Sequence, residues 1–447
     1  MSDPKKPDIK EIPVKAGIKS RTVQVDYLAR VEGEGALYIE IDGQEVKDVK
    51  LKIFEPPRFF EAFMRGRHFL EAPDITSRIC GICPIAYQMS AVSAMEQALG
   101  VNIPEEIQIF RRLLYCGEWI ESHALHVYML HAPDLLGLDD AIQMSKVHPE
   151  IVKDGLFLKK SGNQIVQVIG GREVHPINIR VGGFYKWPSV NDLQKLKNQL
   201  LQARDKALQA IAWLGQFEYP DFNKSYEFVS LSHPDEYPMA RGKIISNKGL
   251  DISVSEFDHH IEEFQVPHSN ALHAKLKNRE NYFLGPMARY NLNREKLSKI
   301  TLQAADSIHF EPHCTNPFRS IIVRSLEILY AFDEAIRILE IFKPIQHPFV
   351  EVKPKKAIGY GITEAPRGSL YHRYHIDEQG VIQDAKIVPP TSQNQYTIEK
   401  DLKEFVEKNF HLPQEKLIWL CEQAIRNYDP CISCATHFLK LHLHHAS

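Results

Sequence analysis

Two pairs of cysteines near opposite ends of the chain constrain the fold more than any other feature. Cys80 and Cys83 form one Cys-x-x-Cys pair, and Cys431 and Cys434 form the other. This spacing places both sulfurs of a pair on one side of a turn, where they can hold one ion. Cys80 and Cys431 are 351 residues apart. A shared metal therefore requires the two ends of the chain to meet.

The spacing alone leaves three interpretations open. Four thiolates most often hold structural zinc, but the two pairs of such sites usually stand about 15–20 residues apart, because the metal replaces a missing core. A chain of 447 residues that is 44% hydrophobic can bury a large core without a metal. A catalytic site for a soft metal is therefore favoured over structural zinc, and redox dithiols or unrelated pairs are the third interpretation.

Composition excludes several other classes of protein. The formal net charge of −3 gives no electrostatic reason to expect nucleic acid as a partner. There is no run of eighteen or more apolar residues, so no transmembrane helix is predicted. Seven cysteines are few and odd in number for a disulfide framework. The three outside the pairs are interpreted as buried apolar residues: Cys116, Cys314 and Cys421.

The N-terminal segment, residues 1–20, is polar and rich in proline and lysine. It lacks the apolar stretch of a signal peptide, so it is predicted to be a flexible leader, and a cytoplasmic location is expected.

The hydrophobic pattern predicts a mainly helical α+β fold with a small β portion at the N-terminus. Alternation over 22–54 predicts a β-meander or hairpins. Helical spacing of apolar residues predicts helices, and two short strands are expected late in the chain. Two regions, 144–187 and 218–312, are expected to be irregular or mixed strand and loop. The predicted helices are 84–99, 104–130, 191–217, 316–342, 397–409 and 413–427, and the strands are 369–376 and 381–388. No repeat or linker is visible, so 21–437 is expected to be one domain.

Four motifs together resemble the large, catalytic subunit of a nickel–iron hydrogenase, and the resemblance extends from about residue 21 to residue 437. The two cysteine motifs with their flanks are its most specific part. The motifs are Arg30-Val31-Glu32-Gly33, Arg78-Ile79-Cys80-Gly81-Ile82-Cys83, Glu364-Ala365-Pro366-Arg367-Gly368 and Asp429-Pro430-Cys431-x-x-Cys434-x-x-His437.

The resemblance implies a nickel ion held by the four thiolates, with Cys83 and Cys434 also bridging to an iron that carries carbonyl and cyanide ligands. Thiolates suit late, redox-active metals. Because dihydrogen is barely acidic, its heterolysis needs a metal and a nearby base. By resemblance, Cys431 accepts the proton first, and Glu32 hydrogen-bonds that cysteine and passes the proton outward. Without the resemblance, Glu32 is more simply a surface carboxylate on a hairpin turn.

Other positions gain roles from the same resemblance. Arg367, after Pro366, is expected over the open face of the metals, with Asp134 and Asp429 as its acidic partners. Thr391 is expected to donate its hydroxyl to a cyanide. From the residues alone, Arg367 is otherwise a surface arginine, and Asp429 and Thr391 are turn residues.

Glu61 and His437 resemble ligands of a magnesium ion, a weaker assignment, since Glu61 also suits the exposed face of a short helix. Tyr87 stands where many relatives carry histidine, four residues after the second cysteine. This departure leaves the metal ligands unchanged but puts in doubt hydrogen bonding and proton transfer there. His123 and His126 are expected to support the site or to pack.

Electrons must leave through partners, because no further cysteine cluster remains for iron–sulfur ligation. The resemblance implies an iron–sulfur small subunit, and diaphorase subunits that carry flavin and bind NAD(P), since no Gly-x-Gly-x-x-Gly fingerprint is present. Maturation by nickel chaperones and a protease is also implied, and residues 438–447 are expected to be a removable extension. A permanent or vector-derived tail is the alternative. For function, a non-catalytic relative from respiratory complex I and a structural zinc protein remain the alternatives.

Overall fold

The N-terminal strands form a meander, as predicted. The computed structural model describes residues 20–42 and 45–436. β1 (Ser20–Val25), β2 (Gly35–Asp42) and β3 (Glu45–Ile53) pair antiparallel in the order β1-β2-β3. Alternate residues of β2 are buried, which is the period of two expected for a sheet with one covered face. The leader over 1–20, apart from Ser20, lies outside the described residues, as do His437 and the tail 438–447.

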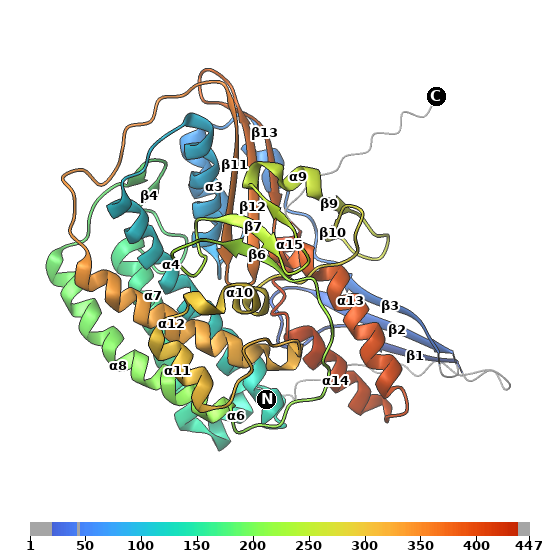
Figure 1. Ribbon diagram of the computed structural model, residues 1–447. Helices are drawn as coiled ribbons and strands as arrows, with labels where there is room; N and C mark the ends of the chain where they lie inside the picture. Colours follow the sequence, from blue (N-terminus) through green and yellow to red (C-terminus); the bar gives the residue numbers. More distant parts are fainter. Residues whose placement is uncertain (1–19, 43–44, 437–447) are drawn as a thin grey trace, which may run out of the picture.

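Long helices form the body of the molecule (Figure 1). The predicted helices at 84–99 and 191–217 are confirmed as α3 (Pro84–Leu99) and α8 (Val190–Leu214). The long helix predicted after Pro104 is α4 (Glu105–Leu125), which continues through η2 (His126–His131), a π-helical stretch, into α5 (Ala132–Leu135). α12 (Ser320–Ile341), preceded by η5 (Pro317–Arg319), packs against both α4 and α8.

The prediction of irregular structure over 144–187 is wrong for its longest part. α7 (Pro149–Gly170) is a helix that packs along α4. Its glycines weaken the helical signal in the sequence. A Cβ on Gly162 would lie 2.7 Å from the Gly117 oxygen of α4, and one on Gly155 would lie 2.4 Å from the Tyr128 ring. The glycines therefore permit a close helix–helix contact that the sequence pattern did not reveal.

A second three-stranded sheet lies against α3. β11 (Ala357–Ala365), β12 (Gly368–Ile376) and β13 (Ile382–Val388) pair antiparallel in that order. β12 and β13 were predicted, whereas β11 was missed. Gly359 and Gly361 interrupt the apolar pattern of β11, but a Cβ on either would lie within 2.4 Å of a backbone oxygen of α3. The turn between β11 and β12 carries Pro366 and Arg367.

Shorter elements complete the chain. Residues 218–312 contain strands as expected, but also two helices, 286–293 and 299–307. The helix predicted to begin at 397 begins seven residues earlier, at Pro390. The remaining elements are α1 (Phe60–Met64), η1 (Phe69–Glu71), α2 (Ala72–Ser77), α6 (Ala141–Val147), β4 (Ile179–Arg180), β5 (Gly183–Phe184), β6 (Val229–Ser232), β7 (Lys243–Ser246), β8 (Asp251–Ile252), η3 (Val254–Glu256), α9 (Phe257–His260), β9 (Ile261–Phe264), β10 (His273–Leu276), α10 (Pro286–Asn293), η4 (Arg294–Lys296), α11 (Lys299–Ser307), α13 (Pro390–Asn409), α14 (Gln414–Arg426) and α15 (Ile432–Ala435).

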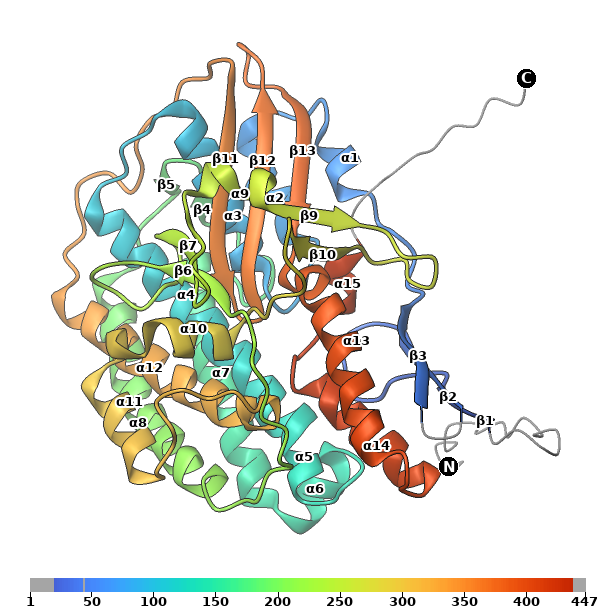
Figure 2. The same ribbon diagram turned by 45° about the vertical axis from the view of Figure 1, so that its right-hand side comes forward.

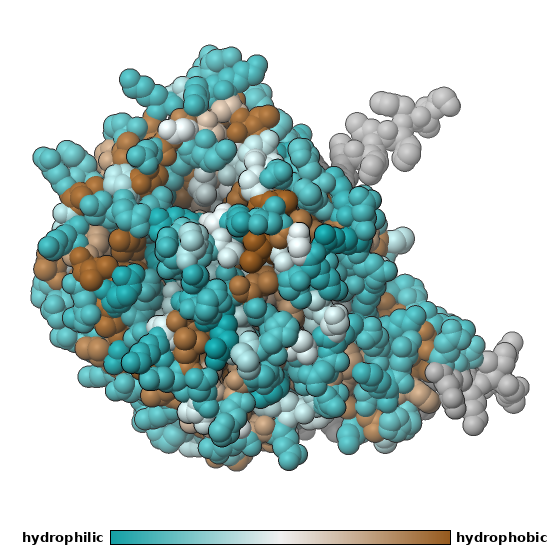
Figure 3. All heavy atoms as spheres, in the orientation of Figure 1, coloured by the Kyte–Doolittle hydropathy of each residue, from teal (hydrophilic) through white to brown (hydrophobic). Residues whose placement is uncertain are grey.

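The arrangement confirms the α+β class. One large hydrophobic core joins the β-meander, the long helices and the second sheet. Within the described part of the chain, none of the helices combines the length and apolarity needed to cross a membrane. The face in Figure 3 is largely covered by hydrophilic side chains. α15 follows α14 at the end of the described chain and lies beside α13 in Figures 1 and 2.

Candidate metal centre

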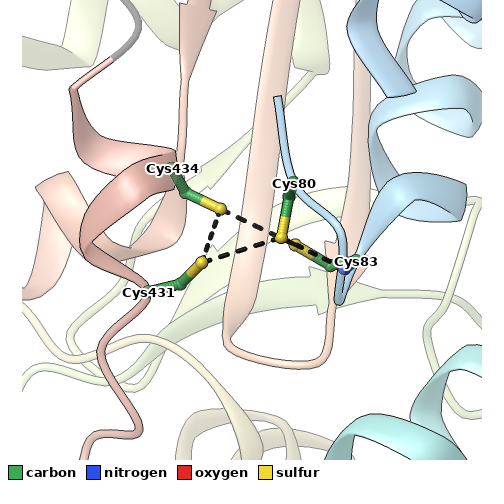
Figure 4. A group of neighbouring side chains, drawn as sticks. All are labelled: Cys80, Cys83, Cys431 and Cys434. Carbon is green, nitrogen blue, oxygen red and sulfur yellow. Dashed lines mark hydrogen bonds between the residues drawn. The ribbon is translucent and has the colours of Figure 1, made fainter. Parts of the chain in front are cut away.

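The four sulfurs of the two cysteine pairs converge at one buried point, where they lie within 4.8 Å of one another (Figure 4). The sulfurs of Cys80 and Cys431 are 3.7 Å apart, as are those of Cys83 and Cys434. Within the pairs the sulfurs are 2.9 and 2.8 Å apart. A metal at about 2.3 Å from four tetrahedral sulfurs would separate them by about 3.8 Å. The donor set and the cross-pair spacing therefore fit a thiolate-bound metal.

The first pair is held by the start of a long helix. Cys83 is the N-cap of α3, yet its side chain caps no helix N–H. That capping comes instead from Glu118 of α4, whose carboxylate accepts from the N–H of Ile85 at 2.6 Å and of Ala86 at 3.1 Å. The Cys80 sulfur accepts from the Cys83 N–H at 3.2 Å. The Cys83 sulfur is thus left available to a metal.

The second pair is held by contacts from distant segments. The Cys431 N–H donates to the Thr391 hydroxyl oxygen at 3.0 Å. The Ile432 N–H donates to the Glu32 carbonyl oxygen at 3.0 Å, and the Ser433 N–H donates to the Glu32 carboxylate at 3.1 Å. Burial raises the pKa of the Cys431 thiol well above its ordinary value, because a thiolate is poorly solvated there.

Glu32 is placed somewhat differently from the expectation. It is half-buried, and its backbone pairs with that of Cys431. The expected hydrogen bond from its carboxylate to the Cys431 sulfur is not among those of the described residues, where the carboxylate accepts from the Ser433 N–H instead.

Arg58 joins the two cysteine motifs and was missed. Its guanidinium donates to the Ile79 carbonyl at 2.7 Å, one residue before Cys80, and also to the Ser433 carbonyl. Its own N–H donates to the Thr436 carbonyl at 2.7 Å. No motif or spacing marks Arg58 in the sequence. Glu118 was missed as well, although a carboxylate in the apolar middle of the helix 104–130 was a usable signal.

Arg367 is buried next to the sulfurs and is 3% exposed. Its Nε donates to the Asp429 carbonyl at 2.6 Å, and its Nη2 donates to the Asp429 carboxylate at 3.0 Å. Burial alone would lower its pKa, but the Asp429 carboxylate and the thiols raise it well above its ordinary value. The preceding carbonyl, of Pro366, accepts from Arg289 at 3.0 Å. These contacts fix a permanent positive charge beside the sulfurs.

The expectation that Asp134 would pair with Arg367 is wrong. The Asp134 carboxylate accepts from Arg426 Nε and Nη2, both at 2.8 Å, and also from Arg30. Arg426 is the last residue of α14, the helix before the second cysteine pair, and Arg30 belongs to the N-terminal motif, which contacts that pair through Glu32. Asp134 therefore joins α5 to both segments. The two guanidinium groups compensate the buried negative charge of Asp134.

The Glu61 carboxylate accepts from the Ile387 N–H at 2.7 Å. Burial raises its pKa to about 7. The second residue of the predicted magnesium pair, His437, lies outside the described residues. Among the described residues, no other histidine, cysteine or carboxylate is grouped with Glu61 in a way that could hold a metal.

Tyr87 and the two helix histidines are fully buried. Burial and the thiols of Cys434 and Cys83 raise the pKa of the Tyr87 hydroxyl well above its ordinary value. His123 contacts Glu327 at 2.9 Å, and burial lowers its pKa to about 4. His126 contacts the Arg426 carbonyl at 2.8 Å. Tyr87 is therefore close to the thiols, and His126 lies 3.9 Å from the Asp429 carboxylate that holds Arg367.

Comparison with known proteins agrees with this geometry. A family model described as nickel-dependent hydrogenase matches residues 58–153 and 327–437. Sulfhydrogenase 2 subunit alpha of Pyrococcus furiosus is 34% identical over 422 residues, covering 94% of this chain and 100% of that protein. The NAD-reducing hydrogenase HoxS subunit beta of Cupriavidus necator is 27% identical over 467 residues, and the alignment covers 94% of this chain and 95% of that protein.

Solved structures show the same fold. An NAD+-reducing [NiFe]-hydrogenase in the H2-reduced state has a TM-score of 0.85 at 26% identity, covering 93% of this chain and 99% of that chain. The Ni-Fe-Se hydrogenase of D. vulgaris Hildenborough has a TM-score of 0.76 at 22% identity, covering 94% and 100%, and shares the fold.

The fold and the buried four-thiol site define a metal-dependent oxidoreductase. The chain belongs to the nickel-dependent hydrogenase large-subunit family. It is the catalytic subunit of a hydrogenase.

Proposed function

We propose that Cys80, Cys83, Cys431 and Cys434 hold a nickel–iron centre that carries carbonyl and cyanide ligands on iron, and that the chain cleaves dihydrogen heterolytically and reversibly. The observation that carries this proposal is the meeting of four buried thiols beside the fixed charge of Arg367. When bound, the centre supplies polarisation of dihydrogen and accepts its electrons.

The chain's own groups manage the proton. Cys431 is the first proton acceptor, because it would be a terminal thiolate ligand of the centre and lies beside Glu32. Glu32 takes the proton outward: its backbone lies beside that of Cys431, and its carboxylate, on a half-buried residue, accepts from the Ser433 N–H between the two cysteines of the second pair. A carboxylate in this position suits general acid–base transfer.

Arg367 and Thr391 would orient the diatomic ligands of the bound centre. The Thr391 oxygen accepts from the Cys431 N–H, which leaves its own O–H to donate to a cyanide. Arg367 is buried and held by Asp429, so its remaining N–H groups present positive charge to the site without a reorganisation cost. Pro366 and Asp429 fix the direction of that side chain.

The electrons leave through partner chains. Cys116, Cys314 and Cys421 are buried and join no metal-binding group among the described residues, so an iron–sulfur small subunit supplies the path. The names of the NAD-reducing relatives favour NAD(P) as the final acceptor, with flavin-containing diaphorase subunits in the complex. A cytoplasmic location fits this acceptor.

Two proposals concern the end of the chain. Glu61, whose carboxylate is fixed by the Ile387 N–H, would bind magnesium together with His437. Residues 438–447 would be removed by a maturation protease once chaperones have delivered nickel. An intact mass of active enzyme that ends at Ser447 would contradict that removal.

The decisive test uses the complex purified without oxygen. We expect about one nickel ion per chain, with four thiolate donors. Infrared bands of metal-bound carbonyl and cyanide are expected, together with hydrogen-dependent reduction of NAD(P). Zinc in place of nickel, with no such bands, would refute the centre. Activity with viologen dyes but not with NAD(P) would refute only the acceptor.

A further inference from the structure

Two histidines and a glutamate converge at a place that the hydrogenase chemistry does not use. The Nε2 atom of His268 lies 2.7 Å from one carboxylate oxygen of Glu399, and the Nε2 atom of His273 lies 3.1 Å from the other. One ligand atom of each side chain lies within 4.8 Å of the other two. Among the described residues, this is the second group able to hold a metal, after the four cysteines.

The three residues come from two elements and a loop. His268 belongs to the loop 265–272 between β9 and β10, His273 begins β10, and Glu399 lies on α13, which packs against β10 (Figure 2). The side chain of His273 is fully buried, whereas those of His268 and Glu399 are 17% and 13% exposed. The group is therefore closed on the β10 side and reached by solvent on the loop side.

The donor set suits a borderline divalent metal ion. Two imidazoles and one carboxylate are a recurrent protein ligand set for zinc, with water as the fourth ligand. Metal–ligand bonds of about 2.0–2.2 Å in a tetrahedron separate the ligand atoms by about 3.3–3.5 Å. The observed nitrogen–oxygen distances of 2.7 and 3.1 Å need only a small opening of the group. The partial exposure of His268 and Glu399 lets solvent supply the water.

The Glu399 carboxylate is held in place by its contacts. Its two oxygens face the Nε2 atoms of the two histidines. The Leu51 N–H occupies one oxygen at 2.9 Å and fixes the orientation of the side chain. Such support of a ligating carboxylate is typical of metal sites. The simpler alternative is a hydrogen-bonded triad that never binds metal.

We propose that His268, His273 and Glu399 bind a zinc ion that fastens the loop 265–272 to α13. The same loop is linked by hydrogen bonds to the segment that carries the second cysteine pair. The side chain of Asn270 donates to the carbonyls of Phe54 and Glu55, and the Glu55 carboxylate accepts from the Ser433 hydroxyl. Zinc at this site thus supports the segment that carries the second cysteine pair. The inference does not depend on the identity of the metal at the cysteines.

The test measures zinc in the purified holoenzyme complex after incubation with zinc sulfate and removal of free metal. We expect about one zinc ion per catalytic chain, with a nitrogen and oxygen shell at about 2.0–2.2 Å in zinc K-edge X-ray absorption. Zinc that had replaced the metal at the cysteines would show a sulfur shell at about 2.3 Å. A sulfur shell alone, or no retained zinc, would overturn the site.

Variants locate the zinc. Glu399→Gln and His268→Gln are expected to lose the retained zinc and the rise in unfolding temperature that zinc gives the wild type. His375→Gln changes a half-buried histidine of β12 outside the group and is expected to keep the zinc. Glu61→Gln is also expected to keep it, which separates this site from the proposed magnesium site. Equal zinc in the wild type and Glu399→Gln would mean a hydrogen-bonded triad only.

Discussion

The two cysteine pairs supply the same ligands to one point but are held in opposite ways. Cys80 and Cys83 precede α3, a helix of 16 residues that packs on the second sheet and is capped by Glu118. Cys431 is the N-cap of α15, a helix of 4 residues near the end of the described chain, and Cys434 lies within that helix. The first pair depends on regular structure nearby, whereas the second depends on single contacts from Glu32, Arg58 and Thr391.

This difference bears on the order of assembly. Helices and hairpins form from contacts close in sequence, whereas contacts such as Glu32 with Ser433 close a loop of nearly the whole chain. The first pair can therefore take its position before the second arrives. A site completed by the chain terminus is consistent with the proposed removal of a C-terminal extension as a late step.

Loss of a ligand should have the largest effect. Cys431→Ala removes one of the four thiolates, so we expect nickel to be lost. Hydrogen oxidation should fall by more than about a hundredfold, because loss of a residue that only supports a ligand already costs about 10–100-fold. Nickel content and hydrogen uptake by the purified complex measure this. Cys421→Ala, which changes a buried cysteine of α14 outside the site, should keep both. Full activity of Cys431→Ala would contradict the proposed ligands.

Arg367→Lys should separate charge from geometry. Lysine keeps the positive charge but cannot make both contacts that the guanidinium makes to Asp429. We expect turnover to fall by about 10²–10³-fold, as for the loss of a preorganised electrostatic group, with nickel retained. Arg373→Lys, at the half-buried contact with Asp258, is the matched control. If nickel were lost together with activity, the role of Arg367 would be structural.

Arg58→Ala tests the support of the second pair. The variant removes donors to the carbonyls of Ile79 and Ser433, and therefore loosens Cys431 and Cys434 relative to Cys80. We expect nickel to be lost to a chelator about 10–100-fold faster, the usual scale for a supporting residue. Arg65→Ala removes an exposed arginine from the same region and should have no effect. Equal rates of nickel loss for Arg58→Ala and the wild type would mean that Arg58 does not hold the second cysteine pair in place.

Glu118→Leu tests the support of the first pair, where we expect a smaller effect on the metal. Leucine leaves the N–H groups of Ile85 and Ala86 without an acceptor, at a cost of about 1–3 kcal/mol each. Glu118→Gln keeps an acceptor and serves as the control. The unfolding temperature should fall in Glu118→Leu, while nickel is retained better than in Arg58→Ala. The opposite ranking would reverse the comparison between the pairs.

The sequence predicted the parts of the molecule that depend on contacts close in the chain better than those that depend on distant contacts. Long apolar helices and the alternating meander were predicted because their periods are local. α7 and β11 were missed because glycines that permit close packing weaken the local pattern. In the site, the cysteines and Arg367 stand in recognisable motifs. Arg58 stands in none, and Asp134 was assigned to the wrong arginine, because partners 292 residues apart are decided by tertiary structure.

The smallest effect should be a pH dependence of stability in the scaffold beneath the first pair. Glu334 of α12 accepts from Arg112 of α4 at 2.6 Å. Burial would raise its pKa, but Arg337 and Arg112 lower it to about 2 from an ordinary 4.5. A depressed carboxyl pKa stabilises the fold above pH 4.5, and this contribution is lost as the pH falls toward 2.

At neutral pH, Glu334→Gln should therefore unfold more easily than the wild type, by up to about 3 kcal/mol for a shift of this size. The difference should shrink as the pH is lowered from about 5 to about 3, because the wild type then loses the same charge. Denaturant unfolding across this range measures it. Glu340→Gln, at a more exposed contact with Lys197, should show little dependence. A constant difference between wild type and Glu334→Gln would mean that packing around Glu334, and not its charge, joins α4 to α12.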